Sequence, residues 1–184
     1  VLLPAGTFVY VYLFKFVSFM QSRLGPMEAG PFGSMQLLAE VGKSGRPALL
    51  KRGLSATVEE LLMASEYILK EGNENVMLCE RGIRTYETAY RFTLDLLAVP
   101  AIKELTHLPV IVDPSHAPGR RDWVESMSLA AVAAGADGII VEVHNEPDKA
   151  ICDAAQQVPS SEFQAMADKI EAIAGVVGKT ISRG

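Results

Sequence analysis

Four apolar segments, each ending in charged residues, constrain the fold of this chain more than any other feature. They recur about every 30 residues, which is the length of a repeating strand–helix unit. Continuous apolar runs of this length are typical of strands buried on both faces, as in parallel sheets. The four segments are PALLKRG at 47–53, NVMLCERG at 75–82, LPVIVDPSH at 108–116 and DGIIVEVH at 137–144.

Helical patterns fill the gaps between these segments. Thr57 followed by Glu60 forms a capping box, which predicts that a helix begins there. A second helix is expected over 86–106, with a break or kink at Pro100 because proline cannot continue a helix. The expected apolar face of the first helix is Val58, Leu61, Leu62, Ile68 and Leu69.

Two further helices are expected in the last third of the chain. Gly135 occupies the place of a C-terminal cap after the third helix, and Gly175 is expected to end the fourth. The third helix is expected to bury Val124, Met127, Ala131 and Val132, and the fourth Phe163, Met166, Ile170 and Ile173.

Four consecutive strand–helix units predict a parallel α/β fold, either a doubly wound sheet or a (β/α)₈ TIM barrel. A doubly wound nucleotide-binding fold should show a glycine-rich phosphate loop, and neither GxGxxG nor GxxxxGK[ST] occurs in the sequence. Functional residues at the C-terminal end of every strand favour the barrel. A complete barrel needs about 250 residues, so this chain of 184 residues is expected to be a partial barrel, about the last four units.

The N-terminal segment 1–34 differs from the rest and is treated as a separate region from the barrel-like domain 35–184. Residues 1–20 are almost entirely apolar, interrupted by Lys15. A membrane span needs about 20 apolar residues and disfavours a central lysine, so a membrane anchor is the weaker alternative. The stronger alternatives for residues 1–20 are a foreign or damaged leader and a pair of buried strands. The chain begins at Val1 rather than Met, which suggests a fragment.

Charge and cysteine content limit the class of protein. The net charge of −5 argues against nucleic-acid binding. Cys79 and Cys152 form neither a disulfide framework nor a CxxC metal motif. These features fit a protein of a reducing, cytoplasmic compartment.

The candidate functional residues lie at or after the C-terminal ends of the predicted strands. Lys51 and Arg81 are candidates for a cationic pocket that binds phosphate or carboxylate. His116, Glu142 and Asp153 offer one imidazole and two carboxylates, a donor set suited to a divalent transition metal. Each residue alone has a simpler interpretation, such as a solvated strand end or a hydrogen-bonded loop histidine. The hypothesis depends on all of them gathering at one end of a parallel sheet.

One protein family has motifs similar to four in this sequence, in the same order: LLKRG, LCERGIRT, DPSHAPGRR and EVH. Over about residues 35–175 the sequence is similar to the C-terminal half of 3-deoxy-7-phosphoheptulonate (DAHP) synthases, of the compact type related to 3-deoxy-octulosonate 8-phosphate synthases. The resemblance implies a transferase that condenses phosphoenolpyruvate with erythrose 4-phosphate, the first step of the shikimate pathway. It also implies a TIM barrel, a homotetramer and a cytoplasmic location.

The resemblance also assigns roles to residues. It implies that Lys51 and Arg81 contact phosphoenolpyruvate, and that Asp113 supports the site or contacts a sugar hydroxyl. A divalent cation (manganese, iron, cobalt or zinc) would be held by three residues, His116, Glu142 and Asp153. The residues counted as catalytic are Lys51, Arg81 and His116. Carbon 3 of the enol would attack the sugar aldehyde, and water would add at carbon 2 before phosphate leaves.

The sequence departs from the family pattern in its first part. The family's cysteine ligand, in an AGPC motif, has no counterpart, because the similar string AGPFG places Phe32 there. The KPRTSPY loop and the arginine of the GARNMQN strand end are also absent. Three alternatives therefore remain: a truncated and inactive form, a 3-deoxy-octulosonate 8-phosphate synthase, and a non-catalytic relative that still binds anions.

Overall fold

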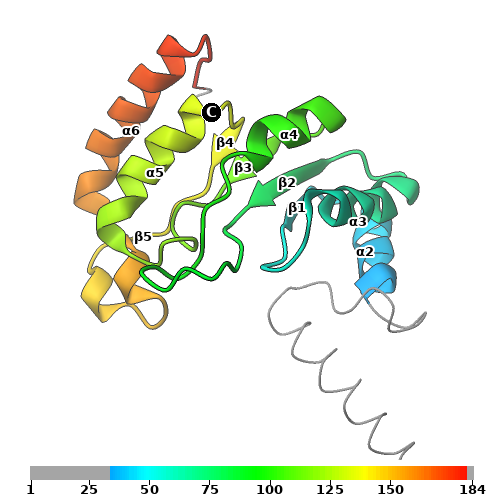
Figure 1. Cartoon of the computed structure of the whole chain (residues 1–184), viewed down its shortest axis with the longest axis horizontal. Helices are drawn as coiled ribbons and strands as arrows, with labels where there is room; N and C mark the ends of the chain where they lie inside the picture. The colour runs from blue at the N-terminus through cyan, green and yellow to red at the C-terminus, as the bar shows by residue number, and fades with distance from the viewer. Residues whose placement is uncertain (1–33, 182–184) are drawn as a thin grey trace, which may run out of the picture. The chain divides into compact units, whose positions relative to one another are not determined.

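The first three apolar segments each form one strand, as the sequence predicts. The computed structural model describes residues 34–181 (Figure 1). The chain divides into two units, one ending at Val76 and one beginning at Met77. The apolar segment 1–20 lies outside the described residues, and of the expected N-terminal segment 1–34 only residue 34 is described. None of the helices that the structure describes combines the length and apolar character needed to cross a bilayer.

The first unit contains helix α2 (Ser34–Lys43), strand β1 (Ala48–Lys51) and helix α3 (Val58–Lys70). The predicted capping box begins α3. The Thr57 hydroxyl accepts a hydrogen bond from the Glu60 amide at 3.1 Å, and the Glu60 carboxylate accepts one from the Thr57 amide at 2.8 Å. The two helices pack closely at Gly42, where a Cβ atom would lie 2.7 Å from the Ile68 carbonyl oxygen. This contact requires a glycine.

The sheet of the second unit joins three parallel strands in the order β2 (Val76–Glu80), β3 (Val110–Val112) and β4 (Gly138–Ile139). Leu78, Val110 and Val112 are fully buried in it. The sheet is parallel and its strands alternate with helices, which confirms the α/β class. Because parallel strands end at the same edge, the residues that follow β2, β3 and β4 are brought to one side.

The helix expected over 86–106 forms only in its second half, as α4 (Ala98–Leu105). Pro100 lies in the first turn of α4, where its missing N–H group has no intrahelical partner to lose. Residues 86–97 form an irregular loop instead, tied back by an antiparallel bridge between Ile83 and Thr93. The proline therefore marks the beginning of a helix rather than a kink within one.

Helices α5 (Arg121–Ala133) and α6 (Ser160–Val176) lie side by side (Figure 1). They form a core whose buried residues are Val124, Val132, Val158, Met166, Ile170 and Ala174. Gly135 has φ 99°, as expected for a cap after α5. Two expectations for α6 are wrong. Phe163 is 43% exposed, and the helix continues through Gly175 to end before Gly178, which has the left-handed φ of 74°.

The fourth apolar segment is not one strand. It divides into β4 and β5 (Val143–His144), and β5 pairs in parallel with β6 (Val158–Pro159) rather than joining the larger sheet. Two short 3₁₀ helices, η1 (Pro147–Lys149) and η2 (Ala154–Gln156), lie between β5 and β6. Glu142 lies in the interruption between β4 and β5, and its backbone amide bonds to the loop that follows β3.

Candidate metal centre

The loop 113–116, directly after β3, supplies three residues that shape the site: Asp113, Ser115 and His116. The carboxylate of Asp113 is 1% exposed. One of its oxygens accepts hydrogen bonds from the backbone amides of Ser115 at 3.2 Å and His116 at 3.0 Å, and the other lies 2.8 Å from His116 Nδ1. Because a carboxylate only accepts, this contact places the proton of a neutral imidazole on Nδ1 and leaves the lone pair on Nε2.

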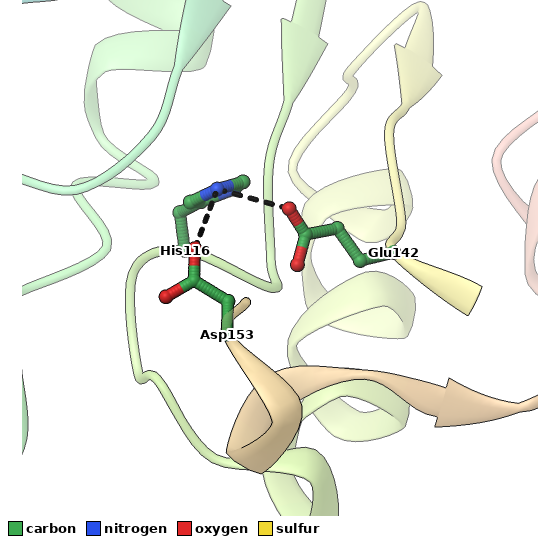
Figure 2. A group of neighbouring side chains, drawn as sticks. All are labelled: His116, Glu142 and Asp153. Atoms are coloured by element: carbon green, nitrogen blue, oxygen red, sulfur yellow. Dashed lines mark ion pairs between the residues drawn. The ribbon is translucent and has the colours of Figure 1, made fainter. Parts of the chain in front are cut away.

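His116, Glu142 and Asp153 meet around that free nitrogen, and we call them the His–Glu–Asp cluster. His116 Nε2 lies 3.1 Å from Glu142 Oε1 and 3.9 Å from Asp153 Oδ2. The ligand atoms of the three side chains all lie within 4.8 Å of one another. Figure 2 shows the two carboxylates directed at the imidazole from separate segments of the chain.

Ser115 links two members of the cluster through the backbone. Its hydroxyl, fully buried, accepts a hydrogen bond from the Glu142 amide at 3.1 Å. On the other side, the Glu142 carbonyl accepts from the Val158 amide at 2.9 Å. The break between β4 and β5 is thus fixed against the His116 loop, and the Glu142 side chain is half-buried, at 32% exposure.

Asp153 adopts an unusual backbone conformation. Its φ of 50° and ψ of 32° place it in the left-handed region, and it is the only non-glycine residue with positive φ in the described part of the chain. Aspartate tolerates this region better than most residues. A strained backbone that directs a carboxylate at a histidine is the kind of feature found at functional sites.

The donor set and its geometry fit a divalent cation. Imidazole nitrogen with carboxylate oxygen suits transition metals such as manganese, iron, cobalt and zinc. Two donors bound at about 2.1 Å to one ion, at angles of about 90–110°, lie about 3.0–3.4 Å apart. The 3.1 Å separation of His116 Nε2 and Glu142 Oε1 is in this range, and the 3.9 Å to Asp153 requires a small inward movement of an exposed carboxylate.

Arg81 follows β2 and is half-buried. Its guanidinium carbon lies 5.5 Å from the centre of the Phe92 ring. The neighbouring Glu80 is fully buried, and its carboxylate accepts a hydrogen bond from the Gly82 amide at 2.7 Å. The segment after β2 is therefore rigid, and it holds the Arg81 side chain against an aromatic face.

Residues 26–175 match the family model described as DAHP synthetase I family. The chain belongs to this family. It is 48% identical over 149 residues to a phospho-2-dehydro-3-deoxyheptonate aldolase of Thermotoga maritima, which covers 81% of this chain and 44% of that protein. It is 32% identical over 152 residues to a 2-dehydro-3-deoxyphosphooctonate aldolase of Geobacter sulfurreducens, covering 77% of this chain and 55% of that protein.

Solved structures of the DAHP synthetase I family give the same result. The crystal structure of the Thermotoga maritima DAHP synthase matches with a TM-score of 0.79 and 48% identity, over 80% of this chain and 44% of that one. A truncated form of the Thermotoga maritima enzyme matches with a TM-score of 0.78 over 56% of its length. The chain therefore spans about half the length of these relatives, and the resemblance drawn from the sequence motifs is confirmed.

Within this family member, the structure brings together some of the predicted site residues. His116, Glu142 and Asp153 form the cluster, and Asp113 supports His116. Lys51 ends β1 in the first unit and is half-buried, so its part in an anion site stays a prediction. The metal-binding role of the cluster and the anion-binding role of Arg81 are likewise predictions.

Three residues around the cluster were not predicted from the sequence: Ser115, Arg91 and Gln156. Ser115 and Gln156 each lie within three positions of a predicted ligand, and this proximity is the signal that could have found them. Arg91 falls in the segment expected to be helical, so nothing in the sequence pattern indicated its contacts with Gln156 and Asp153.

Proposed function

We propose that residues 35–184 form a partial barrel of the DAHP synthase type and that the His–Glu–Asp cluster is its metal site. The proposed reaction is the condensation of phosphoenolpyruvate with erythrose 4-phosphate, the first step of the shikimate pathway. The observation that carries the proposal is the convergence of His116, Glu142 and Asp153 within 4.8 Å, from three segments whose motifs are those of the family. Segment 1–34 is proposed to be an atypical apolar N-terminal segment, of which residues 26–34 fall within the family match.

The site residues would have two separate roles, anion binding and metal binding. Lys51 and Arg81 would bind the phosphate and carboxylate of phosphoenolpyruvate, because ammonium and guanidinium groups pair with these anions. His116, Glu142 and Asp153 would hold the cation, which when bound would polarise the aldehyde of the sugar phosphate. Carbon 3 of the enol then forms a bond to the aldehyde carbon, and water adds at carbon 2 before the carbon–oxygen bond to phosphate breaks.

A second candidate reaction differs only in the sugar. An eight-carbon product needs a five-carbon aldose phosphate, because phosphoenolpyruvate supplies three carbons. The 32% identity to an octulosonate-type relative supports this second candidate. The 48% identity to the heptulosonate-type relative favours the seven-carbon product.

Phosphate release by the full chain, with phosphoenolpyruvate, erythrose 4-phosphate and Mn²⁺, tests the proposal. Activity that is lost in His116→Ala would support it, and a preference for a five-carbon aldose phosphate would support the second candidate. Release of no phosphate, with Mn²⁺ still bound, would identify a non-catalytic relative that retains the metal site. The homotetramer and the cytoplasmic location also remain proposals, and light scattering on the purified chain tests the first.

A further inference from the structure

Gln156 connects the His–Glu–Asp cluster to a cationic side chain. Its amide nitrogen donates a hydrogen bond to Glu142 Oε2 at 2.9 Å, and its amide oxygen accepts one from Arg91 Nη1 at 3.1 Å. The same guanidinium nitrogen lies 3.6 Å from Asp153 Oδ1. Gln156 itself is 2% exposed, while the side chains of Arg91 and Asp153 are 44% and 41% exposed.

The directions of the two hydrogen bonds made by the side chain at position 156 explain why it is a glutamine. Guanidinium groups only donate hydrogen bonds and carboxylates only accept them. A group placed between Arg91 and Glu142 must therefore accept on one side and donate on the other, and a primary amide does both. Glutamate could not donate to Glu142 in its ionised form, and leucine, of similar volume, could do neither.

With this path included, each member of the cluster has one atom held by a neighbour and another facing the shared centre. The held atoms are His116 Nδ1, Glu142 Oε2 and Asp153 Oδ1, and their neighbours are Asp113, Gln156 and Arg91. The facing atoms are Nε2, Oε1 and Oδ2. Fixing the outward atom removes rotamer freedom that cation binding would otherwise have to remove.

Arg91 is itself held in place by the loop that carries His116. Its guanidinium carbon lies 5.4 Å from the centre of the Phe92 ring. The Phe92 amide donates to the Ala117 carbonyl at 2.8 Å, and a Cβ atom at Gly119 would lie 3.1 Å from Arg91 Cδ. The half-exposed arginine thus contacts the backbone at Gly119 and lies over an aromatic ring.

We propose that Gln156 and Arg91 are positioning residues, which hold Glu142 and Asp153 in the arrangement that binds one divalent cation. This inference rests on the proposed metal site, and neither residue is expected to touch the cation. Arg91 also offsets the repulsion between the two carboxylates when no cation lies between them.

Binding of Mn²⁺ alone to the full chain, followed by the electron paramagnetic resonance signal of free and bound Mn²⁺, tests the inference without an activity assay. Gln156→Leu should weaken binding about 10- to 100-fold, the range seen when residues that orient metal ligands are removed. Arg91→Lys keeps the charge but cannot reach Gln156 and Asp153 with one planar group, and should weaken binding at least about threefold. The spectrum of bound Mn²⁺ should also change in both variants.

Two controls sharpen the comparison. Arg120→Lys is the matched variant, because Arg120 also stacks on an aromatic ring, that of Trp123 at 4.7 Å, and its contacts among the described residues are with Trp123 and Asp122. It should bind Mn²⁺ as the unaltered chain does. Because Arg91 contacts Asp153 as well as Gln156, the double variant Gln156→Leu/Arg91→Lys should bind more weakly than Gln156→Leu, but by less than the full effect of Arg91→Lys alone.

The outcomes separate this inference from the proposed function. Failure of the unaltered chain to bind Mn²⁺ would overturn the metal site and the positioning roles together. Binding that is lost in His116→Ala but unchanged in Gln156→Leu and Arg91→Lys would overturn the positioning roles alone. If Gln156→Leu unfolds, as circular dichroism would show, the half-exposed Arg91→Lys decides the question by itself.

Discussion

Asp113 Oδ2 and His116 Nδ1 lie 2.8 Å apart, and the aspartate is 1% exposed while the histidine is 19% exposed. A buried carboxylate therefore sets the proton position of an imidazole whose other nitrogen faces two further carboxylates. A carboxylate bonded to one ring nitrogen fixes the tautomer and orientation of a histidine whose other nitrogen is to bind a metal, as proposed for His116. The relationship accounts for the spacing of aspartate and histidine in the segment DPSH.

Replacing Asp113 with asparagine should weaken Mn²⁺ binding by about tenfold, because the neutral amide polarises the imidazole less than a carboxylate does. Isothermal titration of the full chain with Mn²⁺ measures the change. Asp122→Asn, at an exposed position on α5, is the control and should leave the affinity unchanged. Equal affinities for Asp113→Asn and the unaltered chain would show that the pairing has no influence on the site.

Asp137 should make stability depend on pH in the acid range. Burial alone would raise its pKa, but hydrogen bonds from Lys103, the Val110 amide and Lys179, with the charge of Lys179, lower the pKa from 3.8 to about 2. The lowered pKa stabilises the folded state above about pH 4, and this stabilisation is lost as the pH falls through about 2.

Asp137→Asn therefore tests this contribution. At neutral pH it should lower the free energy of unfolding by about 1–2 kcal/mol, allowing for the partial exposure of the carboxylate. Urea denaturation at several pH values should show the difference from the unaltered chain shrinking between about pH 4 and pH 2. A difference that stays constant over this range would contradict the assignment, and Asp168→Asn on the exposed face of α6 controls for loss of a surface carboxylate.

Gly82→Ala should destabilise the segment that carries Arg81. Gly82 has φ 92°, and a Cβ atom would lie 2.9 Å from both Ala117 Cβ and Phe92 Cβ. Left-handed strain and overpacking together should cost about 2–4 kcal/mol in free energy of unfolding. Gly178→Ala is the matched control, because Gly178 has φ 74° with no atom near the added Cβ, and should cost about 1 kcal/mol. Equal losses in thermal melting would rule out the steric contribution.

The capping box of α3 gives a prediction for the first unit. Thr57→Ala removes the hydroxyl that accepts from the Glu60 amide, and should lower the free energy of unfolding by about 1 kcal/mol. Ser55→Ala, at an exposed position in the same loop, provides the control for loss of a hydroxyl. Hydrogen exchange at the first turn of α3 should accelerate in Thr57→Ala and not in Ser55→Ala; no difference between them would contradict the cap.

The strands and helix ends were predictable where local rules decide them. The apolar segments at 47–53, 75–82 and 108–116 became single strands, because their apolar residues have no polar face to expose. The capping box at Thr57 and the cap at Gly135 depend on a few neighbouring residues. The two caps follow from hydrogen bonding within one turn of structure.

The errors arose where distant residues decide the structure. The fourth apolar segment breaks because the Glu142 amide bonds to the hydroxyl of Ser115, 27 positions away, and this partner cannot be read from periodicity. The loop 86–97 is fixed by contacts such as the Phe92 amide to the Ala117 carbonyl. Long-range hydrogen bonds likewise bring Arg91 and Gln156 to the cluster, so its three members could be named from motifs while their supports could not.

The most direct test of the central claim is the anomalous diffraction of crystals grown from the full chain with Mn²⁺. The account predicts one strong peak about 2.0–2.3 Å from His116 Nε2, Glu142 Oε1 and Asp153 Oδ2. Absence of a peak there, or a bound Mn²⁺ whose ligands do not include His116, would contradict it.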